Sequence, residues 1–181
     1  MQMMMMRLVN PKTETYVNLK EFILSEHFPW FQYNETLEPG CDLGEYDDVP
    51  FLSHGFLIRP GVDGNLYSRS NSEYLNVVQD VFKEICFING LDPEILYRIN
   101  ANYTLPTEKN LPSPPHIDHT YPHKNMLIYL TPTNGGNTIV DGEDVVAKED
   151  DIIIFDGCLK HCARPPATGK RIVLIITYYD S

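Results

Sequence analysis

Short β-prone runs follow one another in the second half of the chain without a helical segment between them, and this order restricts the fold more than any other feature. The runs are "ILYRINANY", "NMLIYLT", "NTIV", "DVVA", "DIIIFD" and "RIVLIITYY", separated by turn signals such as "PTNGG", "DG" and "KEDD". Helices that come first, followed by strands alone, are typical of an α+β protein. We expect the strands to form a sandwich or barrel with the helices packed on one outer face.

Two helices are predicted before these runs. Residues 17–28, "VNLKEFILSEHF", carry apolar residues near helical spacing and stop before Pro29, where a helix would be interrupted. Residues 70–90 offer a Ser/Asn cap, an apolar stripe at helical spacing and a closing Asn89-Gly90. The second segment carries the stronger helix signals.

The segment between the two helices, residues 31–70, is rich in Gly, Pro and Asp and predicts loops with short extended pieces. With 181 residues, 43% of them hydrophobic, the chain suits one ordinary domain with a real core. We therefore expect a single domain over residues 1–181, with a helical and loop part at 1–95 and a strand-rich core at 96–179.

Charge and hydropathy exclude several classes of partner. The formal net charge is −11, and no cluster of Lys and Arg exceeds two adjacent residues. A nucleic-acid binder needs a basic surface that displaces counterions, and an anionic membrane surface attracts basic segments, so we expect neither partner. The longest apolar runs, 152–155 and 172–176, are far too short to span a bilayer.

The start of the chain and the cysteines bear on its compartment. "MQMMMMRLV" lacks the apolar segment of a signal peptide, and its repeated methionines leave the true start codon open. Cys41, Cys86, Cys158 and Cys162 form neither a C-x-x-C pair nor a disulfide framework. These features predict reduced thiols and a cytoplasmic location.

The segment "PPHIDHTYPH", residues 114–123, is the strongest candidate for chemistry. On an extended chain, residues i and i+2 point to the same side, so His116 and Asp118 can converge on one metal ion. A surface loop with a histidine–aspartate hydrogen bond is the competing interpretation. His119 and His123, in the same segment, are expected to be exposed loop histidines.

Residues farther along the chain favour a metal site. His161 follows the apolar run "DIIIFDG", and Arg171 opens "RIVLIITYY". Two His and one carboxylate on one face of a metal leave the opposite face open, which is the ligand set of non-haem Fe(II) oxygenases. A 2-oxo acid bound there needs a cation and a hydroxyl for its distal carboxylate, and Arg171 and Tyr129 can supply them.

The order His116-x-Asp118, His161 and Arg171, with "GGNTIV" between and "HCARPPATGKRIVLIITY" at the end, resembles the 2-oxoglutarate/Fe(II)-dependent dioxygenases. Within that family the chain is most similar to the prolyl-4-hydroxylase-like branch and to compact phage-type oxygenases, over residues 96–179. The resemblance implies a double-stranded β-helix, or jelly roll, for the strand-rich core. It also implies Fe(II), 2-oxoglutarate and dioxygen as cofactors and co-substrates, with ascorbate as a candidate reductant.

The resemblance also assigns site residues. It makes His116, Asp118 and His161 the iron ligands and places Arg171 where the family grips the 5-carboxylate of 2-oxoglutarate. Tyr129 matches the strand tyrosine that shares this carboxylate.

The partner of the 1-carboxylate is less directly indicated. Asn100 and Asn102, on the polar face of the "ILYRINANY" strand, are the candidates, while Tyr103 falls on the opposite face.

The implied reaction is hydroxylation of an unactivated C–H bond, coupled to conversion of 2-oxoglutarate to succinate and CO₂. A peptidyl residue, proline first, is the implied substrate, and a free amino acid or small metabolite is the alternative. A non-catalytic metal-binding jelly roll remains a second hypothesis.

Other polar residues have two interpretations each. Arg98 either neutralises a substrate or pairs with an acidic neighbour, and His54 either lines a substrate entrance or is a structural histidine. Cys158 and Cys162 flank His161 but have no fourth zinc ligand at an established spacing, so we expect both to be small buried residues.

Overall fold

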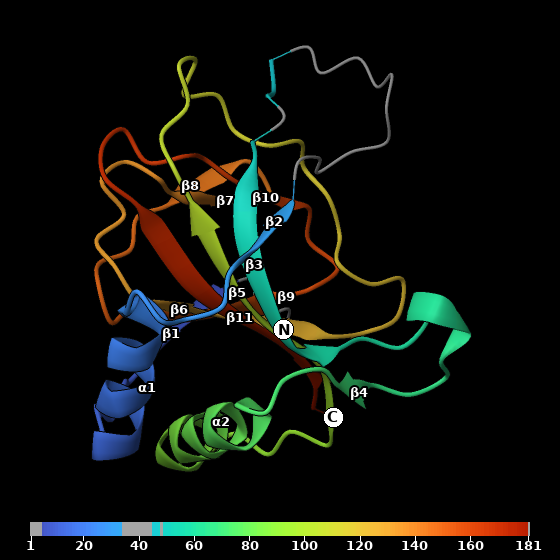
Figure 1. Ribbon diagram of the computed structural model, residues 1–181. Coiled ribbons are helices and arrows are strands. Elements are labelled where there is room, and N and C mark those ends of the chain that lie inside the picture. The colour runs from blue at the N-terminus through green and yellow to red at the C-terminus, as the bar shows by residue number, and fades with distance from the viewer. Residues whose placement is uncertain (1–4, 34–44, 48, 181) are drawn as a thin grey trace.

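Two antiparallel β-sheets and two helices form the part of the chain that the computed structural model describes, residues 5–33, 45–47 and 49–180 (Figure 1). The larger sheet consists of β1 (Met5–Leu8), β2 (Phe31–Tyr33), β3 (Phe51–Ile58), β4 (Arg69–Ser70), β5 (Ile95–Thr104), β6 (Lys124–Tyr129), β9 (Ile152–Asp156) and β11 (Arg171–Tyr179). The smaller sheet consists of β7 (Thr138–Val140), β8 (Glu143–Val145) and β10 (His161–Ala163). The helices are α1 (Glu14–Leu24) and α2 (Leu75–Asn89), with a short 3₁₀ turn at Val62–Gly64.

The strand order of the larger sheet is β1-β9-β6-β11-β5-β3-β2, with β4 paired to β3, and that of the smaller sheet is β10-β7-β8. The two faces of the larger sheet pack against different partners. One face, which includes Ile99 of β5 and Leu174 of β11, forms a core with α1 and α2. The other, which includes Leu127 of β6 and Val173 of β11, packs against Val140 of the smaller sheet. Figure 1 shows the helices below the larger sheet and the smaller sheet above it. The predicted α+β class, with helices outside one sheet, is confirmed, and the two sheets fit a jelly roll.

Both predicted helices exist, with shifted ends. α1 begins earlier, because the Thr13 side chain accepts a hydrogen bond from the backbone N–H of Tyr16 and caps the helix. α2 begins only at Leu75, and its cap residue makes no side-chain capping bond, so the predicted Ser/Asn cap is wrong. Gly90 ends α2 in the left-handed conformation, with φ at 65°, as predicted.

The expectation of loops for residues 31–70 missed an interior strand. β3 lies between β2 and β5 in the larger sheet, and its buried positions do not alternate along the strand. Its register slips between Gly55 and Leu57, where a bulge breaks the period of two. β1, in the methionine-rich start, pairs with β9. Residues before position 95 are therefore not only helices and loops, because they supply four strands of the larger sheet.

The structure also bears on the expectations for the cysteines and for membrane-spanning segments. Cys86 and Cys162 are buried free thiols, whereas Cys158 is exposed, which corrects the expectation that it is buried. Cys41 lies outside the described residues. None of the described helices is long and apolar enough to cross a membrane.

Helix α1 is tied to the turn before β9 by one carboxylate. Oδ1 of Asp150 accepts a hydrogen bond from the Tyr16 hydroxyl at 2.7 Å and forms an ion pair with Lys20 at 2.6 Å. The other carboxylate oxygen, Oδ2, forms an ion pair with Lys12 at 3.0 Å. Burial alone would raise the pKa of Asp150, but these three donors lower it to about 2. An unfolded aspartate ionises near pH 4, so the ionised form of Asp150 stabilises the fold.

Replacing Asp150 with Asn should remove this contribution, which is present above about pH 4 and is lost as the pH falls toward 2. Asn also tolerates the left-handed backbone of Asp150, where φ is 68°. We expect Asp150→Asn to lower the free energy of unfolding by about 1 to 2 kcal/mol at pH 7, allowing for partial solvent screening. The difference should shrink between pH 4 and pH 3 in urea titrations. Glu149→Gln is the matched control, and a difference independent of pH would contradict the assignment.

Candidate metal centre

A pair of reciprocal backbone hydrogen bonds places the two candidate histidines side by side. The N–H of His116 donates to the carbonyl of His161 and the N–H of His161 donates to the carbonyl of His116, both at 2.9 Å. Residues paired across an antiparallel bridge project their side chains to the same face. The two imidazole rings accordingly lie with their centroids 4.7 Å apart. The loop that carries His116 is thus fixed to β10 of the smaller sheet.

The tautomers of both rings follow from their backbone contacts. Nδ1 of His116 lies 3.2 Å from the carbonyl oxygen of Pro114, and Nδ1 of His161 lies 3.2 Å from that of Leu159. A carbonyl only accepts hydrogen bonds, so each Nδ1 carries the proton and each Nε2 keeps its lone pair. Burial, followed by the neighbouring His161, lowers the pKa of His116, which keeps that ring neutral. Neutral imidazoles with a free Nε2 are the form that binds metals.

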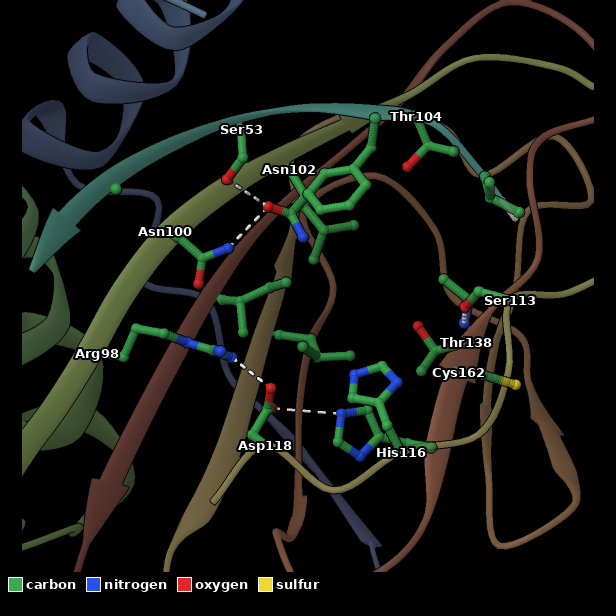
Figure 2. A pocket seen from close by; sticks show the side chains of 18 of the residues that line it. Ser53, Arg98, Asn100, Asn102, Thr104, Ser113, His116, Asp118, Thr138 and Cys162 are labelled. Atoms are coloured by element: carbon green, nitrogen blue, oxygen red, sulfur yellow. Dashed lines mark hydrogen bonds and ion pairs between the residues drawn. The ribbon is translucent and has the colours of Figure 1, made fainter. Parts of the chain in front are cut away.

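Asp118 completes the cluster two residues after His116. Its Oδ2 lies 3.3 Å from Nε2 of His161, and its Oδ1 forms an ion pair with Arg98 at 2.8 Å. Burial alone would raise the pKa of Asp118, but Arg98 and the two imidazoles outweigh burial and hold it well below its usual range. The carboxylate is therefore ionised at neutral pH. Figure 2 shows Asp118 between Arg98 and His116.

These three side chains fit a divalent metal. One ligand atom from each of His116, Asp118 and His161 lies within 4.8 Å of the others. Nε2 of His161 faces a carboxylate oxygen while its Nδ1 faces a carbonyl oxygen, so a neutral ring with one N–H cannot satisfy both acceptors. Either a second proton on the ring or a metal cation between the ring and Asp118 would resolve this mismatch. Two imidazoles and one carboxylate are also the facial set that suits Fe(II).

A buried arginine lies in the same cavity as this cluster. Nε of Arg171 donates to the carbonyl of Gly136 and one terminal nitrogen donates to the Thr138 hydroxyl, both at 2.8 Å. No carboxylate of the described residues pairs with this guanidinium, and burial lowers its pKa without removing its charge. A buried, unpaired cation is costly unless an anion accompanies it. The structure thus provides a position for a ligand carboxylate.

The backbone at Gly136 lies close to the Arg171 side chain. A Cβ atom at Gly136 would lie 3.0 Å from Cδ of Arg171 and 2.9 Å from the carbonyl oxygen of Thr133. Glycine is therefore needed beside the guanidinium. The Tyr129 hydroxyl lies 2.7 Å from the Thr138 hydroxyl, and the Arg171 guanidinium lies over the Tyr129 ring. Tyr129 thus contacts Arg171 directly with its ring and through Thr138 with its hydroxyl, and it is not among the residues that line the cavity.

The cavity that joins the metal cluster to Arg171 has a volume of about 630 Å³. Asn100 and Asn102 line this cavity from the polar face of strand β5, the face on which the sequence alternation placed them (Figure 2). Oδ1 of Asn102 accepts from Nδ2 of Asn100 at 2.7 Å and lies 2.8 Å from the Ser53 hydroxyl. The amide group of Asn102 is therefore oriented, and its nitrogen has no partner among the described residues.

The structure decides between the two interpretations of His54 and corrects the expectations for His119 and His123. His54 does not line the cavity: its nitrogens lie 2.8 Å from the Pro29 carbonyl and 2.9 Å from the Ser72 hydroxyl, among aromatic rings on the helix side of β3. A fully bonded, packed histidine is a structural one. His119 and His123 were expected to be exposed, but only 5% and 4% of their surfaces are accessible.

His119 and His123 are buried in the segment that follows Asp118. Nε2 of His119 lies 2.8 Å from the Thr177 hydroxyl, and the His119 ring stacks on Tyr121. The ring of His123 occupies the space beside Gly157, where a Cβ atom would lie only 2.1 Å from Nε2. These contacts hold the segment after Asp118 against the larger sheet. No local pattern indicated this burial, because short polar loops are usually exposed.

Sequence reasoning also missed Thr138 and Arg59. Thr138 lies on β7 with Val140, at the inward positions of "NTIV", and alternation along that strand was the available signal. Arg59, directly after β3, donates to the backbone carbonyl of Asp118 and lines the cavity. No signal could have found Arg59, because β3 itself was not predicted.

Comparisons with known proteins agree with this architecture. No protein-family model and no curated protein sequence matches the chain. Among solved structures, the chain is similar to an oxidoreductase of the 2OG-Fe(II) oxygenase family from Burkholderia pseudomallei, with a TM-score of 0.69 and 14% identity, over 96% of this chain and 84% of that one. The fold is that of the 2OG-Fe(II) oxygenases.

Other proteins that share the 2OG-Fe(II) oxygenase fold catalyse different reactions. A prolyl hydroxylase from Trichoplax adhaerens, in complex with a hypoxia inducible factor peptide, gives a TM-score of 0.54 at 14% identity, over 97% of this chain and 83% of that one. The carbocyclase SnoK from nogalamycin biosynthesis gives a TM-score of 0.59 at 14% identity, over 97% and 79%. Identity this low establishes the fold alone, so the chemistry has to be argued from the residues of this chain.

Binding of a divalent metal should depend on the three convergent side chains. We expect Asp118→Ala and His161→Ala to weaken binding of Fe(II), measured anaerobically by calorimetry, by at least about 100-fold, because each removes one of three protein ligands. His27→Ala is the matched control, since 83% of the His27 side chain is exposed and it lies outside the cavity. Equal affinity of all three variants would show that the cluster is not the metal site.

Proposed function

We propose that this protein is an Fe(II)- and 2-oxoglutarate-dependent oxygenase that hydroxylates a C–H bond, and that its two sheets form a double-stranded β-helix. One observation carries the proposal: a His-Asp-His cluster and a buried arginine, which has no acidic partner among the described residues, line one cavity. A metal site that serves structure alone has no use for such a cation. Bound iron would supply activation of dioxygen, with electrons from 2-oxoglutarate, which leaves as succinate and CO₂.

The residues of the chain would bind and orient the co-substrate. Arg171 and Thr138 would hold the distal carboxylate, in a position closed to water because Arg171 is only 4% exposed. Asn102 has an oriented amide nitrogen without a partner among the described residues, which suits the second carboxylate, and Asn100 keeps that amide in place. Restricting both ends of the co-substrate fixes its middle near the cluster, which lowers the entropic cost of reaction.

Arg98 has a positioning role in this proposal. Its ion pair with Oδ1 of Asp118 leaves Oδ2 directed at His161, so the carboxylate presents one defined oxygen to the cluster. Nδ1–H bonds to backbone carbonyls orient the two imidazoles in the same way. The metal site would therefore be preorganised before iron binds.

The substrate class remains a proposal with alternatives. A peptidyl residue, proline first, is one candidate, and a free amino acid or small metabolite is another. A non-catalytic metal-binding module is the candidate from a different class, and it would bind metal without consuming 2-oxoglutarate. Neither nucleic acid nor a membrane is proposed as a partner, in view of the acidic net charge of −11.

An anaerobic visible spectrum tests the proposal without knowledge of the substrate. Protein with Fe(II) and 2-oxoglutarate should show a metal-to-ligand charge-transfer band that is absent with Fe(II) alone. In air, with ascorbate present, the same mixture should form succinate slowly, and Asp118→Ala and His116→Ala should abolish both signals. Metal binding without a band or succinate would favour the non-catalytic module.

Arg171 and its neighbour Lys170 form a matched pair for the second test. Lys170 points to the other face of the sheet, with its ammonium over the Tyr103 ring. We expect Arg171→Gln to raise the 2-oxoglutarate concentration needed for half-maximal band intensity by about 10- to 100-fold, since it removes a charge-assisted bond to a carboxylate. Lys170→Gln should leave that concentration unchanged, and Fe(II) affinity should stay the same in both variants. Equal effects of the two substitutions would contradict the assigned role.

A further inference from the structure

The cavity carries more positive charge than the metal and the co-substrate require. Arg59, Arg98 and Arg171 line it, and among the described lining residues Asp118 is the only acidic one. The chain as a whole has a net charge of −11, so an excess of cations inside the cavity runs against its composition. Such a local reversal of sign concentrates anions at the site.

Arg98 and Arg171 lie at opposite ends of this cavity. Arg171 is paired with Thr104 on β5, six residues from Arg98 on the same strand. At 3.3 Å per residue, the two positions are about 20 Å apart along the sheet. Figure 2 shows the His116 imidazole between Arg98 on one side and Thr138, the hydrogen-bond partner of Arg171, on the other. A co-substrate gripped by Arg171 therefore does not occupy the Arg98 end.

Two guanidinium groups converge at that second end. Arg98 pairs with the side chain of Asp118, and Arg59 donates to the backbone carbonyl of the same residue. Each contact uses a single N–H of the five that a guanidinium carries. Arg59 has no ion-pair partner among the described residues, because a carbonyl does not neutralise its charge. Both arginines line the cavity beside the metal cluster.

The cavity holds more positive than negative charge even when the metal and the co-substrate are bound. In the complex proposed above, the two charges of Fe(II) and that of Arg171 match those of Asp118 and the 2-oxoglutarate dianion. Arg59 and Arg98 are then left without compensation. The ion pair with Asp118 explains why Arg98 is present, but it does not explain why Arg59 is present. Partly buried cations are stabilised by an anion that enters with paired hydrogen bonds.

We propose that the substrate carries a carboxylate, which Arg59 and Arg98 bind beside the metal cluster. This inference rests on the proposed function and specifies the substrate class of the same site. A planar guanidinium matches a carboxylate with two parallel hydrogen bonds. Phosphate sites usually add backbone N–H nests or a helix N-terminus. None of the described residues that line the cavity begins an α-helix, and Val62 begins only a three-residue 3₁₀ turn, so a carboxylate is favoured. A neutral prolyl side chain would leave Arg59 without an ion-pair partner among the described residues and would give Arg98 none besides Asp118.

Matched acid and amide probes test this inference on the protein loaded anaerobically with Fe(II) and 2-oxoglutarate. The free probes are L-aspartate against L-asparagine and L-glutamate against L-glutamine. The peptide probes are capped alanine tetrapeptides that contain Asp or Glu, against the same peptides with Asn or Gln, and a capped prolyl tetrapeptide. Affinity is measured as a shift of the charge-transfer band, which reports a ligand next to the metal. Loss of the band would instead report displacement of 2-oxoglutarate.

We expect at least one acid, free or peptidyl, to shift the band about 10-fold more tightly than its amide. The free and peptidyl arms show which source supplies the carboxylate. Arg59→Gln should reduce that preference about 10-fold, with the band itself intact. Arg69→Gln is the matched control, since Arg69 pairs with Asp63 and does not line the cavity.

Several outcomes would contradict the substrate inference or the function on which it rests. If every amide or the prolyl peptide binds as well as the acids, if no acid shifts the band, or if acids only displace 2-oxoglutarate, the substrate inference is overturned. If Arg59→Gln keeps the full preference, the assigned residue is wrong and the inference fails with it. If the band never forms, the proposed oxygenase function fails instead, so the two failures are distinguishable.

Discussion

The short antiparallel bridge between His116 and His161 is the contact on which the candidate site depends. It joins a loop that precedes β6 to a strand of the smaller sheet, and it brings together two residues 45 positions apart in the chain. Without it, the H-x-D segment would have no fixed position relative to the second histidine. Backbone hydrogen bonds supply this constraint, so it does not require the metal.

The electrostatics of the site follow from that arrangement. Once the imidazoles are placed, Asp118 is buried beside them, and Arg98 keeps it ionised against the cost of burial. At the other end, Gly136 lets Arg171 approach the backbone, and Thr138 orients its guanidinium. Each charged group is held by neighbours on different strands. The two sheets act as a rigid frame for charges that would otherwise be costly to bury.

Sequence patterns predicted the parts of this protein whose period is regular. The alternation of "ILYRINANY" placed Arg98, Asn100 and Asn102 on one face, as observed, and the stripe and Gly90 of α2 predicted its existence and its end. β3 was missed because a bulge after Gly55 and the polar Ser53 and His54 break its period. The burial of His119 and His123 was missed because it depends on packing against distant residues. Local patterns carry no information about such contacts.

Strand β5 uses both of its faces for different purposes. One side supplies Ile99 and Ala101 to the core beneath the helices, and the other supplies Arg98, Asn100 and Asn102 to the cavity. Because side chains alternate with a period of two, a slip of one residue would exchange the two sets. Polar groups would then enter the core while aliphatic ones filled the site. The same pairing errors that would disrupt the core of this molecule would also disrupt its cavity, so one register determines both the packing of the fold and the lining of the candidate site.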